Sequence, residues 1–145
     1  MRHLILFVVI LAGTACAEKK SDLTIPAAKV RAALALSAFE CSALAGQPAE
    51  STRLFNAGLL AGRDFLKFAD SNNNGFNSIS SQIDPMWGLV AERPSADFKL
   101  GEIYAAMRNR IDAERRGDEG DWQTKRDQWY TEKNCAFVAS EPAAK

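Results

Sequence analysis

Apolar residues recur at every third or fourth position through most of the chain after residue 25, which is the spacing of amphipathic helices. The segment 26–46, PAAKVRAALALSAFECSALAG, shows this spacing first. Thr24 is placed to cap its start, Pro26 suits the first helical turn, and Gly46 and Pro48 end it. Its many alanines would let another helix approach closely. The spacing predicts a buried stripe made of Val30, Leu34, Ser37, Cys41 and Leu44.

A second helix is predicted over residues 49–70, AESTRLFNAGLLAGRDFLKFAD. Its apolar face carries Leu54, Gly58, Ala61, Phe65 and Phe68. Gly58 and Gly62 have the small-x-x-x-small spacing that allows close helix contact, and the charged residues around them exclude a membrane span. We therefore expect the two glycines to pack against helices of the same domain, with a homodimer contact as the alternative.

The second half of the chain predicts one short helical turn and two further helices. Pro85 would begin the turn and Pro94 would end it. Ser95 would cap a helix that Gly117 closes, and Asp121 would cap the last helix. The apolar stripe of the first of these two helices consists of Leu100, Ile103, Met107 and Ile111.

Runs that alternate apolar and polar residues between hairpin turns are not found in the sequence. The length of 145 residues corresponds to one domain. The sequence thus predicts an all-α single domain over residues 26–137, with about four helices plus a short helical turn. Residues 138–145 are predicted to form a frayed tail.

Residues 1–17 have the composition of a secretory signal peptide, with a basic start, an apolar run and small residues at the end. The apolar run is too short to cross a bilayer as a helix. Cleavage after it would leave a polar leader over residues 18–25. In the alternative, Cys16 is lipidated as in bacterial lipoproteins, although Gly13 stands where such signals usually carry leucine. We expect a bacterial protein exported to the periplasm, or anchored to an envelope membrane through Cys16.

Charge gives no reason to expect nucleic acid or anionic membrane as a partner. The chain has 18 basic and 18 acidic residues, and loss of Arg2 with the signal would leave 17 against 18. A nearly neutral protein lacks the basic surface that such partners require. No segment after the signal has the apolar length of a transmembrane helix.

Two cysteines, Cys41 and Cys135, remain outside the signal. An even pair in an oxidising compartment predicts a disulfide, which would join the first helix to the C-terminal segment. The alternative of two free thiols with a redox role lacks a C-x-x-C pair.

The stretch DSNNNGFNSIS, Asp70 to Ser80, begins like an EF-hand calcium loop. Asn72 and Asn74 occupy the third and fifth positions, and glycine occupies the sixth. The match then fails, because Asn77 stands at the normally apolar eighth position and Ser81 replaces the bidentate glutamate at the twelfth. We interpret the stretch as a polar turn between helices and expect no metal site there.

Few groups in the sequence could support catalysis. His3 is the only histidine and would leave with the signal, and pairing both cysteines would remove the thiol nucleophile. No serine-nucleophile motif or phosphate-binding glycine loop is present. The remaining catalytic option is a carboxylate pair that cleaves glycan. Its candidates are Glu40, Asp64, Asp84, Asp97 and Glu102.

Glu40 is the most interesting of these carboxylates, because it lies in a nearly all-apolar helix where burial would raise its pKa. A structural role is the main expectation, with Glu40 at the helix edge or paired with an arginine such as Arg53 or Arg63. We therefore predict no enzyme, no cofactor and no catalytic residue, and keep a glycan-cleaving carboxylate enzyme as an alternative.

Three tryptophans are candidates for partner binding. Trp122 and Trp129 lie seven residues apart and so share a helix face. Core packing is the main interpretation, and the alternative is an exposed anchor of the kind enriched at interface hot spots. Trp87 lies between two prolines and is a further candidate for partner binding, again with core packing as the main interpretation.

By exclusion, the sequence predicts a protein-binding module whose partner is another envelope protein. An inhibitor or immunity protein against a toxin or hydrolase acting in the envelope would fit this prediction. The alternative is a protein of a different class, a lipid-anchored accessory or structural protein, and it requires that Cys16 is lipidated.

Overall fold

The computed structural model describes residues 22–71, 75–90, 95–117, 120–138 and 140. These residues form five α-helices and two 3-10 helices, and no β-strand occurs among them. The elements are α1 (Ile25–Leu44), α2 (Pro48–Ser71), α3 (Gly75–Ile79), η1 (Ser80–Gln82), η2 (Pro85–Val90), α4 (Ala96–Gly117) and α5 (Trp122–Glu132). The predicted all-α fold is confirmed, with α1, α2, α4 and α5 as the four main helices. The signal segment, Cys16 and Pro94 lie outside the described residues.

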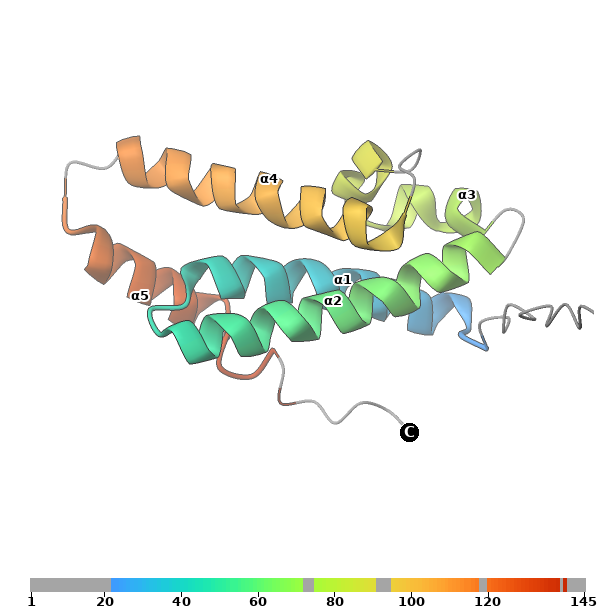
Figure 1. The fold of residues 1–145 in the computed structure, drawn as a ribbon, viewed down its shortest axis with the longest axis horizontal. Coiled ribbons are helices and arrows are strands. Elements are labelled where there is room, and N and C mark those ends of the chain that lie inside the picture. The colour runs from blue at the N-terminus through green and yellow to red at the C-terminus, as the bar shows by residue number, and fades with distance from the viewer. Residues whose placement is uncertain (1–21, 72–74, 91–94, 118–119, 139, 141–145) are drawn as a thin grey trace, which may run out of the picture.

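The helices are arranged around a long hairpin (Figure 1). α1 and α2 run antiparallel and share the most extensive contact among the described elements, and α4 lies along this pair. α3, η1 and η2 gather at one end of the hairpin, and α5 packs at the opposite end. None of the described helices combines the length and the apolar character needed to cross a membrane.

Side-chain caps begin three of the helices where the sequence predicts them. Thr24 Oγ1 accepts a hydrogen bond from the Ala27 N–H at 3.4 Å, and Ser95 Oγ accepts one from the Phe98 N–H at 3.2 Å. Asp121 Oδ1 accepts from the Gln123 N–H at 3.0 Å. Each cap satisfies a backbone donor that the first helical turn leaves without an intrahelical partner.

The predicted apolar stripes of α2 and α4 are buried along their whole length. Gly58 lies under the ring of Phe39 from α1, and Gly62 lies under the side chain of Leu100 from α4. A Cβ atom on Gly58 would stand 2.6 Å from Phe39 Cδ1. In the described structure both glycines therefore make room for side chains of the same domain.

The stripe predicted for α1 is partly wrong. Val30 is 59% exposed and Ser37 is exposed, whereas Cys41 and Leu44 are buried. The buried face is formed instead by Ala28, Ala32, Ala35, Leu36, Ala38, Phe39, Cys41, Ser42 and Leu44. Alanines face α2 because the antiparallel pair packs closely, so small residues take positions that a count of large apolar residues assigns to solvent.

The predicted polar turn at Asp70–Ser80 is partly helical. Residues 75–79 form α3, and Ile79 is fully buried in the main core. Ile79 therefore attaches this segment to the core, a contact that a purely polar turn would not make. Asn72 and Asn74 lie outside the described residues, and within them no group of His, Cys, Asp or Glu is placed to hold a metal ion.

A disulfide joins Cys41 of α1 to Cys135, which follows α5. The two Cα atoms are 5.3 Å apart, and both cysteines are buried in a small cluster with Leu54. α5 itself has no fully buried residue. The disulfide therefore attaches the segment that follows α5 covalently to α1.

Candidate binding site

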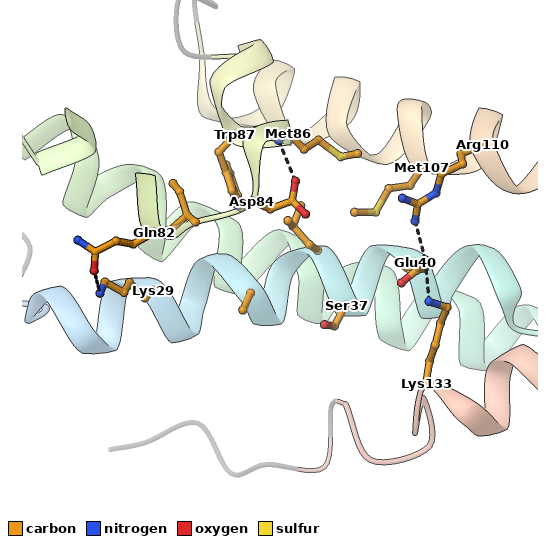
Figure 2. A pocket seen from close by; sticks show the side chains of 13 residues that line it. Lys29, Ser37, Glu40, Gln82, Asp84, Met86, Trp87, Met107, Arg110 and Lys133 are labelled. Carbon is orange, nitrogen blue, oxygen red and sulfur yellow. Dashed lines mark hydrogen bonds and ion pairs between the residues drawn. The ribbon is translucent and has the colours of Figure 1, made fainter. Parts of the chain in front are cut away.

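A groove runs along α1 between α4 and the segment that follows α3 (Figure 2). We call it the α1–α4 groove, and its volume is about 460 Å³. Its floor is one face of α1, because these positions recur at helical spacing. The floor consists of Lys29, Ala33, Leu36, Ser37 and Glu40. The rest of the lining comes from the segment after α3, from α4 and from the segment after α5. It includes Asp84, Met86, Trp87, Met107, Arg110 and Lys133.

An ion network closes one end of the groove. Glu40 Oε1 accepts from Arg110 Nη2 at 2.5 Å and from Lys133 Nζ at 3.1 Å, so that α1, α4 and the segment after α5 meet at one carboxylate. The prediction that Glu40 pairs with an arginine is confirmed, but its partner is neither Arg53 nor Arg63. Packing of α4 against α1 brings Arg110 to Glu40 across 70 residues of sequence.

Lys29 lies at the other end of the groove and Asp84 in its middle, and neither makes an ion pair with another described residue. Lys29 donates to the neutral Gln82 side chain and has no carboxylate partner among the described residues. Asp84 Oδ1 accepts from the backbone N–H of Met86 at 2.8 Å, which caps the start of η2.

A second hollow, of about 510 Å³, adjoins the first and shares Glu40, Arg110 and Lys133 with it. Its other lining residues are Ile111, Glu114, Trp129 and Glu132. The shared ion network therefore stands between the α1–α4 groove and the surface of α5.

The surface of α5 carries Trp122 and Trp129, both half-buried. Their rings meet edge to face, with centroids 5.9 Å apart and planes at 87°. Lys125 Nζ lies 5.2 Å from the centre of the Trp129 ring, within reach of a cation–π interaction. The two tryptophans thus pack on each other and on a lysine, and neither belongs to the buried core.

Trp87 has a different position. It is 1% exposed and meets Phe65 edge to face with centroids 4.5 Å apart. Core packing is confirmed for Trp87, and the alternative of an exposed anchor is wrong for this residue. Its Nε1–H is buried and has no hydrogen-bond acceptor among the described residues.

Most of the candidate carboxylates are held in separate ion pairs. Asp64 lies 3.6 Å from Arg31, and Asp97 accepts from Arg63 at 2.8 Å, which lowers the pKa of Asp97. Glu102 lies half-buried on α4. Glu40 and Asp84 are the candidates that line the same groove.

A further network fastens α5 to α2 beside the disulfide. Glu50 accepts from Arg53 at 2.6 Å and from the Tyr130 hydroxyl at 2.6 Å. The hydrogen bonds from Arg53 and Tyr130 lower the pKa of Glu50 from 4.5 to about 2. Burial, together with the bond to Glu50, raises the pKa of Tyr130 from 10.0 to about 12.

Sequence reasoning missed the groove and three of its charged residues, Lys29, Arg110 and Lys133. The spacing of Lys29 and Glu40 places both on one face of α1 and was a usable signal. Arg110 and Lys133 reach that face only through tertiary packing. No family model, curated protein or solved structure matches this chain.

Proposed function

We propose that this protein is a protein-binding module and that α5 carries its main contact surface. The observation that supports the proposal is the Trp122–Trp129 pair, which is partly exposed on a helix without a fully buried residue. Partly exposed tryptophans next to charged side chains have the composition of interface hot spots.

The surroundings of the pair favour the same function. Trp129 lines a hollow together with Arg110, Glu114 and Lys133, so an apolar ring lies beside both kinds of charge. A central aromatic group with a charged rim is the usual anatomy of a protein interface. The disulfide and the Glu50–Tyr130 contact hold α5 in place, which lowers the entropy lost on binding.

We infer that the partner is another protein of the bacterial envelope. Support comes from the signal-like composition of residues 1–17 and from the Cys41–Cys135 disulfide, which suits an oxidising compartment. An inhibitor or immunity protein against an envelope-targeting toxin or hydrolase is the form we propose. A lipid-anchored accessory protein is the alternative. An intact mass of the native protein distinguishes the two, because it shows whether residue 16 is lipidated or has been removed.

The proposal is tested by capturing the C-terminally tagged protein from its native envelope fraction without reductant. We expect a stoichiometric partner, and we expect the variant Trp122→Ala/Trp129→Ala to lose it without losing its thermal transition. Phe98→Ala, which removes an aromatic ring of 50% exposure from α4, is the matched control and should capture normally. Recovery of the protein alone under gentle washing would contradict the proposal.

A second candidate function rests on Glu40 and Asp84, because two carboxylates lining one groove are the minimum for glycan cleavage. Glu40 Oε1 is already occupied by Arg110 and Lys133, which weighs against this role. A screen of cell-wall glycans with wild type and Glu40→Gln decides the matter: hydrolysis lost in a folded variant would establish the enzyme.

A further inference from the structure

We propose that the α1–α4 groove binds an extended acidic segment of the partner protein, with a carboxylate near each end and a basic side chain between them. The inference rests on the proposed protein-binding function and gives the chemistry of the segment that the partner inserts. It assigns a second contact region, which adjoins the hollow lined by Trp129 and shares Arg110 and Lys133 with it.

Charge alternates along the groove. Figure 2 shows Lys29 at one end, Asp84 near the middle, and Arg110 with Lys133 at the other end. Lys29 has no carboxylate partner among the described residues, and Arg110 and Lys133 share the single carboxylate of Glu40. Among the residues that line the groove itself, each end therefore has one more positive than negative charge, and Asp84 adds a negative charge between them. Glu114 and Glu132 line only the adjoining hollow. A segment that is complementary to this groove carries acid, base and acid in that order.

Unused donors at both ends favour carboxylates as the matching groups. Arg110 contacts Glu40 through one guanidinium nitrogen, and a guanidinium offers five N–H donors. The ammonium groups of Lys29 and Lys133 each have three donors, and one contact is made by each. A ligand carboxylate can therefore bind either end without displacing Glu40 or Gln82, and such charge-assisted bonds are the stronger kind.

The length of the groove fits a short extended chain. Lys29 and Glu40 are eleven positions apart on α1, which corresponds to about 16 Å along the helix axis. An extended segment covers the same distance with about five residues.

The surfaces of the groove suit a peptide backbone and the stems of long side chains. Ala33 and Ser37 on the floor are small and exposed, so a chain can lie close to α1. Met86 and Met107 also line the groove, and their flexible side chains can adapt to a ligand. Trp87 also lines the groove, so its indole N–H can report on a ligand bound there.

The test uses two synthetic peptides of five residues, acetyl-EAKLE-amide and its charge-reversed counterpart acetyl-KAELK-amide. Alternate side chains of an extended chain point the same way, so the three charged groups of either peptide face one side. The ¹⁵N-labelled protein is titrated with each peptide while the three tryptophan indole N–H resonances are followed. Spectra of Trp122→Phe and Trp129→Phe assign the remaining resonance to Trp87 without changing the core.

We expect the acidic peptide to shift the Trp87 indole resonance and the charge-reversed peptide to leave it unchanged. Lys29→Gln and Arg110→Gln should each weaken binding by roughly fivefold, which corresponds to one solvent-exposed ion pair. Arg63→Gln removes an arginine that pairs with Asp97 outside the groove, and it should bind like wild type. Circular dichroism checks that each variant is folded.

Equal binding of both peptides, no shift at millimolar peptide, or an equal effect of Arg63→Gln and Arg110→Gln would overturn the inference. These failures are distinguishable from failure of the proposed function. If the envelope partner is captured but the acidic peptide does not bind, the groove inference alone is wrong. If the peptide binds but no partner is captured, the proposed function is wrong and the groove remains a peptide site.

Discussion

At the scale of single residues, Gly58 is a point of close packing between α1 and α2. A Cβ atom there would stand 2.6 Å from Phe39 Cδ1 and 3.2 Å from the backbone oxygen of Ala35. The phenyl ring could move, but the backbone oxygen is fixed by α1. We expect Gly58→Ala to lower the free energy of unfolding by about 1–3 kcal/mol, as overpacked cores do.

Gly101 on α4 is the matched control for this prediction, because a Cβ atom there would meet nothing within 4 Å. Gly101→Ala should raise the free energy of unfolding by about 0.5–1 kcal/mol through helix propensity alone. Urea unfolding measures both variants. An equal change in the two, in either direction, would contradict the packing assigned to Gly58.

The second residue-scale prediction concerns pH and the bond between Tyr130 and Glu50. Hydrogen bonds from Arg53 and then Tyr130 lower the pKa of Glu50 to about 2, so its ionised form stabilises the fold above its ordinary pKa of 4.5. That contribution is lost as pH falls from about 4.5 through about 2. Tyr130 has a raised pKa of about 12, so its contribution is complete below pH 10 and is lost as pH rises through about 12.

Tyr130→Phe removes the phenol while keeping the ring. We expect it to lower the free energy of unfolding at pH 7 by less than ~1 kcal/mol, because Glu50 is partly exposed and solvent screens the interaction. The difference in the free energy of unfolding between wild type and variant should decrease as pH falls from 4.5 to 2. Urea unfolding across this range measures the difference. A difference that stays constant would show that the bond does not depend on ionised Glu50.

The sequence predicts the role of a single residue correctly where that role depends only on neighbours in the same helical turn. The caps Thr24, Ser95 and Asp121 depend only on neighbours within the same turn, and all three are confirmed. The ion pair of Glu40 depends on Arg110 and Lys133, which are distant in sequence, and sequence reasoning named other arginines.

At the scale of elements, the long helices were predictable because their apolar stripes repeat over several turns. The stripes of α2 and α4 contain large apolar residues, and their predicted burial is confirmed. α1 was harder, because its buried face is mostly alanine and its exposed face includes Val30. The approach of α2 selects that face, and this information is absent from the spacing within α1.

The attachment of α5 gives the element-scale prediction. The Cys41–Cys135 disulfide closes a sequence separation of 94 residues, which on the chain-entropy model is worth roughly 4–5 kcal/mol. We expect Cys41→Ala/Cys135→Ala to lower the free energy of unfolding by that order. Because α5 has no fully buried residue, its backbone amides should lose hydrogen-exchange protection first.

Hydrogen exchange followed by mass spectrometry tests the order of loss. Under conditions where the variant is still folded, α5 should exchange faster than in wild type while the centre of the α1–α2 hairpin stays protected. Uniform loss of protection across α1, α2 and α5 would contradict the view that the disulfide mainly fastens α5.

At the scale of the whole molecule, the fold class was predictable and the groove was not. Helical spacing, the scarcity of strand patterns and the two cysteines were enough for an all-α domain pinned by one disulfide. The α1–α4 groove arises where α4, the segment after α3 and the residues after α5 meet α1. Its position depends on how the elements pack, and no local pattern in the sequence encodes it.

The central claim is that α5 contacts another protein, and in-cell photo-crosslinking tests it most directly. A photoreactive phenylalanine analogue is placed at Trp122 and, as a control, at Phe98, which is exposed near the end of α4 away from α5 (Figure 1). We predict one crosslinked product with a different protein from position 122 and none from position 98. No product from position 122, a product only with a second copy of this chain, or equal products from both positions would contradict the claim.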